Sequence, residues 1–149
     1  MMKKAMMLLA GLWMLAAGTE AQAQHDRRQT RFADLPAAAQ QFVKENFGNT
    51  QISHIKSEGR MIDRDYQVTF ADGSKIEFDK NGQWDEIWTR YGKIPASVLP
   101  AGIRTYLREH YPDLPLRRVE RDRKGYELEL GSGLELDFSP NGRLLKASY

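Results

Sequence analysis

The chain has 149 residues, no cysteine and a nearly balanced charge of 22 basic and 20 acidic residues. This balance, without a basic stripe interleaved with aromatic residues, gives no sign of a nucleic-acid partner. Without cysteine the chain can form neither a disulfide nor a cysteine-linked lipid anchor, so a hydrophobic core must hold the fold together.

The N-terminal residues have the order of a secretory signal peptide. Residues 1–4 form a basic start, residues 5–17 are almost wholly apolar, and Ala21-Gln22-Ala23 offers a cleavage site. The apolar run is shorter than the ~20 residues that a membrane-spanning helix needs. We therefore predict a signal peptide at 1–23, a flexible lead-in at 24–34, and a periplasmic or secreted mature protein without a membrane span.

Two segments share one helical pattern. The first contains Leu35, Ala39, Phe42, Val43 and Phe47, and the second contains Leu99, Ile103, Tyr106, Leu107 and Tyr111. Both read i, i+4, i+7, i+8, i+12, which is one face of a helix. A proline follows the leucine in each segment, near the helix start, where its missing N–H costs nothing.

Matched strand patterns follow each predicted helix, so the chain contains an internal repeat. Tyr66-Gln67-Val68-Thr69-Phe70 alternates apolar and polar residues, as does Tyr126-Glu127-Leu128-Glu129-Leu130. The offset between the copies falls from 64 to 60 along the chain. The first copy therefore has four extra residues near 59–64, which indicates a longer hairpin loop there.

An Asn-Gly pair closes the last hairpin of each copy. Pro140 precedes the second pair, and a three-residue loop keeps this proline out of the strand. The glycine then takes the left-handed position of the loop. This register predicts Trp84 opposite Phe78 and Leu144 opposite Phe138, all on the core side.

The predicted fold class is α+β, a tandem repeat of one helix and a four-stranded antiparallel sheet. The helices cover one face and leave the other open. We expect the first repeat at 35–87, a linker at 88–98 and the second repeat at 99–149. The sequence does not settle which way Trp88 and Tyr91 point.

These motifs resemble the PepSY-like family of exported proteins, also described as β-lactamase-inhibitor-like. The resemblance rests on the following residues: Leu35-Pro36, Phe42-Val43, Phe47, Tyr66-Gln67-Val68 and Asp79-Lys80-Asn81-Gly82-Gln83-Trp84. The second copy keeps the pattern but has Leu144 in place of Trp84. The resemblance implies a tandem helix-plus-sheet fold with the two sheets side by side. It carries over no catalytic residue, because a fold does not fix a function.

No motif of enzyme chemistry stands out. The mature chain has three widely separated histidines, His25, His54 and His110, and it lacks a G-x-S-x-G elbow and a phosphate-binding glycine loop. Asp79–Asp85 faintly suggests a calcium loop, but the bidentate glutamate that ends such a loop is missing. We therefore predict no catalytic residue, metal or cofactor. A hydrolase whose site no motif reveals and a calcium-dependent module stay as alternatives.

The strand alternation turns a group of carboxylates away from the core. The candidate partner-binding residues are Glu77, Asp85, Glu127, Glu129, Glu135 and Asp137. Such a face can be a solvated surface that opposes aggregation, or an acidic platform for a basic partner. Part of its charge could be neutralised by Arg117, Arg118, Arg121 and Arg123 on the adjacent strand. We predict a non-catalytic, inhibitor-like module that binds a protein or peptide of the cell envelope on the open sheet face.

Overall fold

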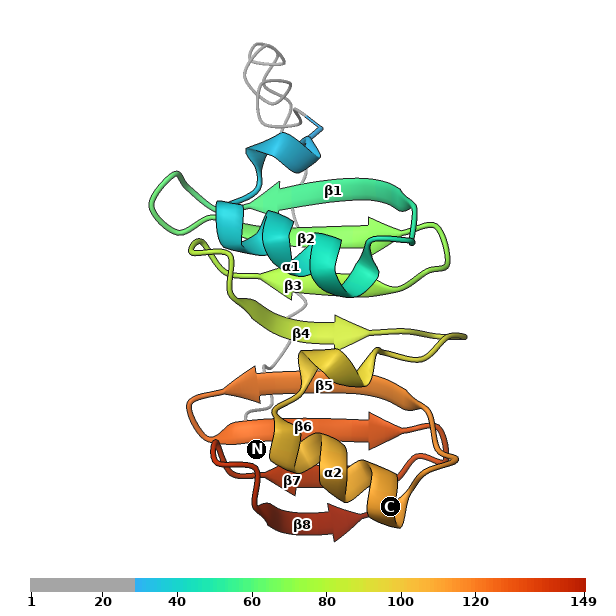
Figure 1. Cartoon of the computed structure of the whole chain (residues 1–149). Helices are drawn as coiled ribbons and strands as arrows, with labels where there is room; N and C mark the ends of the chain where they lie inside the picture. The colour runs from blue at the N-terminus through green and yellow to red at the C-terminus, as the bar shows by residue number, and fades with distance from the viewer. Residues whose placement is uncertain (1–28) are drawn as a thin grey trace, which may run out of the picture.

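The computed structural model describes residues 29–149, so the predicted signal peptide and residues 24–28 of the lead-in lie outside the described residues. In the remainder of the lead-in, Phe32–Asp34 form a short 3-10 helix, η1, and Phe32 packs against the core. Figure 1 shows two α-helices on the same face of one sheet. The opposite face is called the open face below.

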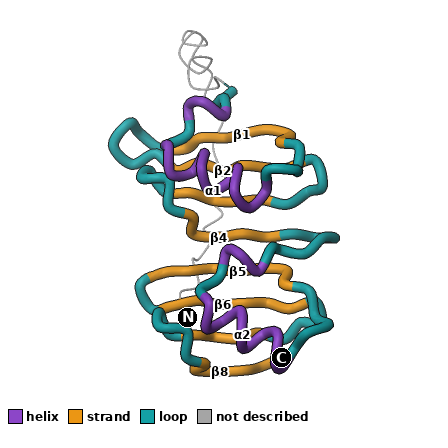
Figure 2. The backbone as a smooth tube through the Cα atoms, viewed as in Figure 1, coloured by secondary structure: helices purple, strands orange, loops and turns teal. Residues whose placement is uncertain are grey.

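A helix followed by four strands occurs twice along the chain (Figures 1 and 2). The first half contains α1 (Ala37–Phe47), β1 (Ile52–Glu58), β2 (Asp65–Phe70), β3 (Lys75–Phe78) and β4 (Trp84–Trp88). The second half contains the 3-10 helix η2 (Ala96–Val98), α2 (Ala101–His110), β5 (Leu116–Asp122), β6 (Gly125–Leu130), β7 (Glu135–Phe138) and β8 (Leu144–Ser148).

All eight strands belong to one antiparallel sheet in the order β1 to β8. The two four-stranded sheets that were expected side by side are thus parts of one continuous sheet. The two halves join because β4 pairs with β5, with Ile87 opposite Val119 and Trp88 opposite Arg118. The open face is therefore one continuous surface.

The helices bury the faces that the spacing predicts. Ala39, Val43 and Phe47 of α1 are buried, as is Ile103 of α2. Each helix begins directly after a proline, Pro36 or Pro100, which precedes its first helical residue.

Both Asn-Gly loops have the predicted three-residue form. Asp79 and Gln83 are joined by a backbone hydrogen bond of 2.8 Å, and Gly82 has a φ of 78°. The second loop repeats this geometry, and Gly142 has a φ of 82°. As predicted, Trp84 lies opposite Phe78 and Leu144 lies opposite Phe138.

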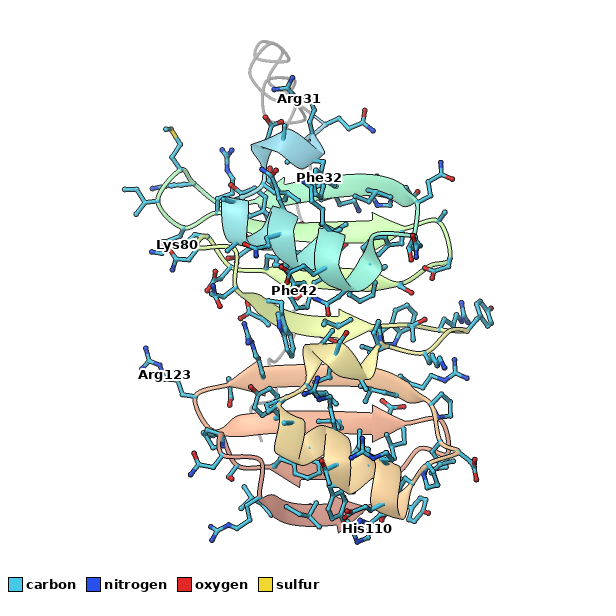
Figure 3. The ribbon with its side chains drawn as sticks, in the orientation of Figure 1. Arg31, Phe32, Phe42, Lys80, His110 and Arg123 are labelled. Atoms are coloured by element: carbon cyan, nitrogen blue, oxygen red, sulfur yellow. The ribbon has the colours of Figure 1, made fainter. Side chains whose placement is uncertain are left out.

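One hydrophobic core extends through both halves on the helix side. The Phe47 ring of α1 stacks on Phe70 of β2 with 5.2 Å between centroids. Phe42 extends from α1 towards the sheet (Figure 3), where it contacts the rings of Phe78 and Trp84. These contacts fix the sheet beneath the helices and so hold the strands that build the open face.

Candidate functional site

A row of carboxylates runs across five neighbouring strands of the open face. Glu77 on β3 lies opposite Glu86 on β4, which lies opposite Glu120 on β5. Glu120 in turn lies opposite Glu127 on β6, and Glu127 lies opposite Asp137 on β7. We call these five residues the acidic row. Since neighbouring strands are about 4.8 Å apart, their like charges repel one another.

The row continues to both edges of the sheet with other residue types. Gln67 on β2 and Lys56 on β1 extend it on one side, and Lys146 on β8 extends it on the other. Lysine at an edge strand opposes pairing with strands of another chain. The negative charge therefore lies in the interior of the face.

A second row runs beside the first and has a different character. It contains Lys75, Trp88, Arg118, Glu129 and Glu135, on β3 to β7 in that order. We call it the mixed row. Lys75 Nζ lies 5.9 Å from the centroid of a Trp88 ring, and Arg118 is paired with Trp88 on its other side. A half-buried indole thus stands between two cations, while on β6 and β7 both rows are acidic.

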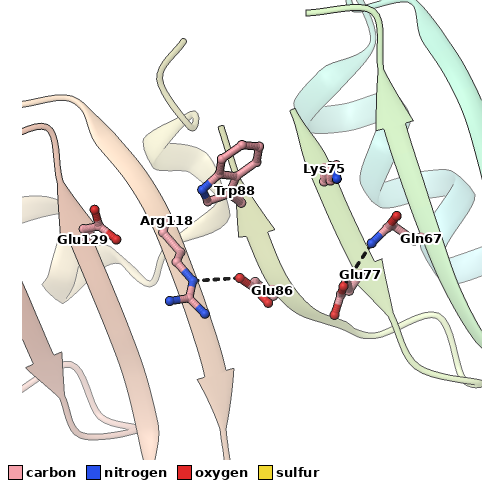
Figure 4. A pocket seen from close by; sticks show the side chains of 7 residues that line it. All are labelled: Gln67, Lys75, Glu77, Glu86, Trp88, Arg118 and Glu129. Atoms are coloured by element: carbon pink, nitrogen blue, oxygen red, sulfur yellow. Dashed lines mark hydrogen bonds and ion pairs between the residues drawn. The ribbon is translucent and has the colours of Figure 1, made fainter. Parts of the chain in front are cut away.

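A shallow cavity of about 360 Å³ lies over the junction between the two halves (Figure 4). Its lining comes from five strands: Gln67, Lys75, Glu77, Glu86, Trp88, Arg118 and Glu129. Arg118 Nε donates to Glu86 Oε1 at 2.7 Å, and Gln67 Nε2 donates to Glu77 Oε1 at 3.1 Å. The lining combines an aromatic ring with charges of both signs, which suits a polar segment that carries some apolar surface.

A smaller cavity of about 80 Å³ adjoins the first and is almost wholly acidic. Apart from Arg118 and Leu128, its lining consists of carboxylates: Glu120, Glu127, Glu129, Glu135 and Asp137. Burial raises the pKa of Glu120, and the charges of Glu86 and Glu127 raise it further, although Arg118 acts in the opposite direction. The pKa of Arg118 is itself raised, because its contacts with Glu86 and Glu120 outweigh the opposing effect of burial.

Five of the six residues predicted from the sequence stand in these two rows: Glu77, Glu127 and Asp137 in the acidic row, Glu129 and Glu135 in the mixed row. The sixth, Asp85, lines neither cavity. A bulge in β4 places Glu86, rather than Asp85, opposite Glu77. Burial raises the pKa of Asp85, and the charges of Asp79 and Asp65 add to this effect.

Alternation in the sequence does not identify Glu86 and Glu120 as members of the row. A bulge precedes each of them in its strand. Buried residues on either side of such a bulge lie three positions apart instead of two: Trp84 and Ile87 on β4, Leu116 and Val119 on β5. This spacing is the sequence signal that could have found both glutamates and settled that Trp88 faces the cavity.

Of the four arginines that could neutralise the face, Arg118 pairs with its carboxylates. Arg121 lies on the helix side, where its guanidinium stands 4.2 Å from the centroid of a Trp84 ring. Its Nε donates to the Trp84 carbonyl oxygen at 2.7 Å. Arg117 donates to carbonyl oxygens of the segment after β4, and Arg123 lies in the turn between β5 and β6 (Figure 3).

Among residues 29–149, no group of three or more histidine, aspartate or glutamate side chains is arranged to hold a metal ion. Within the same residues, neither helix is long and apolar enough to span a membrane.

Two helices over one face of an eight-stranded antiparallel sheet, with charged rows on the other face, define a single-sheet α+β protein. The chain belongs to the family described as "Putative beta-lactamase-inhibitor-like, PepSY-like", whose model matches residues 64–146. No curated protein is similar enough to the chain to count as a match.

Solved structures of periplasmic proteins are similar over most of the chain. A protein from Bacteroides thetaiotaomicron, described as a putative calcium-regulated periplasmic protein, is 33% identical, with a TM-score of 0.76. The match covers 82% of this chain and 96% of that one. A putative periplasmic protein of unknown function from Bacteroides vulgatus is 36% identical over 80% of this chain and 95% of its own, with a TM-score of 0.71. The protein is accordingly periplasmic or secreted.

Proposed function

We propose that the protein is a non-catalytic binding module of the cell envelope, whose open face holds a basic segment of a partner protein or peptide. The acidic row is the observation that carries this proposal. Five carboxylates on adjacent strands disfavour the folded state through repulsion. A cationic partner would relieve that repulsion, and the local negative field would speed its association.

The proposed binding residues are the six predicted from the sequence, Glu77, Asp85, Glu127, Glu129, Glu135 and Asp137, together with Glu86, Glu120 and Trp88. The family's description as inhibitor-like supports a role in protein interaction. We also propose that 35–87 and 99–149 are copies of one unit, joined by 88–98. The same order of elements and the paired Asn-Gly loops support this division.

The test begins with capture of partners from envelope extract by the secreted protein. Association rates of a captured partner are then measured with the unchanged protein and with a variant carrying Glu127→Gln, Glu129→Gln and Glu135→Gln. We expect the variant to associate more slowly at low salt and the difference to shrink at high salt, since salt screens the field.

The matched control removes three carboxylates elsewhere, through Glu45→Gln, Glu109→Gln and Asp113→Asn. These residues are exposed and lie outside both rows. The control should associate at the unchanged rate. Equal association rates for all three proteins at low salt would show that the acidic face is only a solvated surface.

An envelope hydrolase is a second candidate, favoured by the carboxylate pair Glu120 and Glu127. A raised pKa beside a second carboxylate is an arrangement that general acids use. The pair lines a cavity of only about 80 Å³, whereas small-ligand sites are usually several times larger. Binding therefore has the better support. Loss of hydrolysis of an envelope substrate on Glu120→Gln, with partner binding kept, would favour the enzyme instead.

A calcium-dependent role is the remaining candidate, because one similar structure is described as calcium-regulated. In this chain, Asp79 Oδ1 accepts hydrogen bonds from the backbone N–H groups of Asn81 and Gln83, at 2.8 and 3.0 Å. That carboxylate thus already closes its turn. Calorimetric titration with Ca²⁺ would decide: heat of binding that disappears in Asp79→Asn would support a calcium site in this loop.

A further inference from the structure

We propose that the segment held by the open face is a basic α-helix lying across the strands, an inference that rests on the proposed function. The acidic row spans four gaps between strands. At about 4.8 Å per gap, its ends are about 19 Å apart. A partner that pairs with the whole row must present cations at a similar repeat.

The repeat of the row is closer to that of a helix than to that of an extended peptide. Side chains at i, i+4, i+7 and i+11 form one stripe of a helix with a spacing of about 5.4 Å per turn. Alternate side chains of an extended chain are about 6.7 Å apart. Over four gaps the helix drifts from the row by about 2 Å and the extended chain by about 8 Å. Flexible lysine or arginine side chains can absorb the smaller difference.

The mixed row gives such a helix a second line of contact. The two rows lie two residues apart along each strand, about 7 Å, while a helix with its side chains is about 10–12 Å across. A helix centred over the acidic row therefore also reaches the cavity beside Trp88. Because Lys75 and Arg118 flank that indole, the flank of the helix above it should be apolar or acidic rather than basic.

One polar side chain of the open face, Thr69, lies buried opposite a residue of the larger cavity. Its side chain belongs to the open face, since its neighbours Val68 and Phe70 are in the core. Thr69 is only 8% exposed, and its Oγ1 has no hydrogen-bond partner among the described residues. Buried hydroxyls almost always have a partner. Thr69 lies opposite Lys75, which lines the larger cavity, but Thr69 itself lines neither cavity. Its Oγ1 is covered by protein, so a bound segment reaches it only by displacing neighbouring side chains.

Three synthetic peptides of equal length and charge test the proposal. The first forms a helix with lysines at i, i+4, i+7 and i+11; the second spreads the same lysines around the helix. The third places four lysines at alternate positions with threonines between them, to favour an extended form. By calorimetry at low salt, we expect the first to bind the secreted protein at least roughly tenfold more tightly than the others, as several aligned pairs allow. Equal affinity for all three peptides, or tighter binding of the extended peptide, would contradict the proposal that the bound segment is a helix.

Two variants locate the binding. Glu127→Gln with Asp137→Asn removes two members of the acidic row, and Glu109→Gln with Asp113→Asn removes two exposed carboxylates elsewhere. The first pair should weaken binding of the first peptide, called the striped peptide below, roughly tenfold. The control pair should leave its affinity unchanged. Circular dichroism of each variant confirms that it is folded. Equal weakening by both pairs would show that only net charge is recognised and would overturn the proposal.

Competition separates this inference from the function on which it rests. Suppose that a captured envelope partner binds the open face but is not displaced by the striped peptide. That result would contradict the proposed helical segment and leave the proposed function in place. A partner that binds the open-face variants as tightly as the unchanged protein would contradict the proposed function itself.

Discussion

Trp84 lies where the two halves meet on the helix side, and it is only 4% exposed. Its ring centroid is 6.0 Å from that of Phe42 and 6.5 Å from that of Tyr126. Truncation would leave a cavity between helix and sheet, so we expect Trp84→Ala to lower the free energy of unfolding by ~3–5 kcal/mol. Leu145→Ala, at a 56% exposed position, should change it by less than ~0.5 kcal/mol. Denaturant unfolding measures both; a loss below ~1 kcal/mol at Trp84 would contradict a core role.

Glu120 makes the stability of the fold depend on pH. Because burial and neighbouring carboxylates raise its pKa in the folded state, folding favours its protonated form. That contribution is fully present below the pKa of the unfolded chain and is lost as pH rises through the raised pKa. We expect Glu120→Gln to be more stable than the unchanged protein near neutral pH, with a weaker decline in stability as pH rises from acid. The free energy of unfolding of both proteins, measured across that pH range with Glu109→Gln as control, checks this. The same pH dependence for Glu120→Gln and the unchanged protein would contradict it.

At the scale of elements, the two Asn-Gly loops differ in what they contact. A Cβ at Gly82 would lie 2.8 Å from the backbone nitrogen of Ala39 and 2.9 Å from Pro36 Cβ, at the start of α1. The nearest atom to a Cβ at Gly142 would be 3.6 Å away. Both alanine substitutions carry the left-handed strain of ~1–2 kcal/mol, but Gly82→Ala adds a clash. We expect it to lower the thermal midpoint more than Gly142→Ala; equal shifts would mean that the loop moves freely away from α1.

The regular elements were predictable because their patterns are local. Alternation places Val68 and Leu128 in the core, and the glycine loops then fix the register that follows them. In β4 the alternation assigned Trp84 to the core side and Asp85 to the open face, and in β5 it assigned no face; a bulge in each strand shifts the alternation by one residue. This is why the sequence indicated most of the candidate site but missed Glu86 and Glu120.

The union of two sheets into one was not predictable from these patterns. Ile87 and Val119 are opposite each other in β4 and β5 but lie far apart in the sequence. Apolar alternation shows that each strand has a buried face, but it does not show which strand lies beside it. That choice depends on the packing of both helices and the connecting segment, where Ile94 and Val98 are buried in the common core.

For the whole molecule, a balanced composition conceals an uneven distribution of charge. The two rows, taken with the lysines at their ends, hold seven carboxylates and four cations. The full chain has slightly more basic than acidic residues. The open face therefore carries a local negative field that the net charge of the chain does not reveal.

One sheet and one core also make the two halves dependent on each other. Ile87 and Val119 are fully buried where β4 meets β5, so neither half covers this edge alone. We expect one cooperative unfolding transition, with the same midpoint by tryptophan fluorescence and by far-UV circular dichroism. Fluorescence reports on β4 and its junction with the second half, because Trp84 and Trp88, the tryptophans of the described chain, both lie in β4. Val119→Ala, in the second half, should lower both midpoints together. A shift confined to the dichroism signal would show that the halves unfold independently.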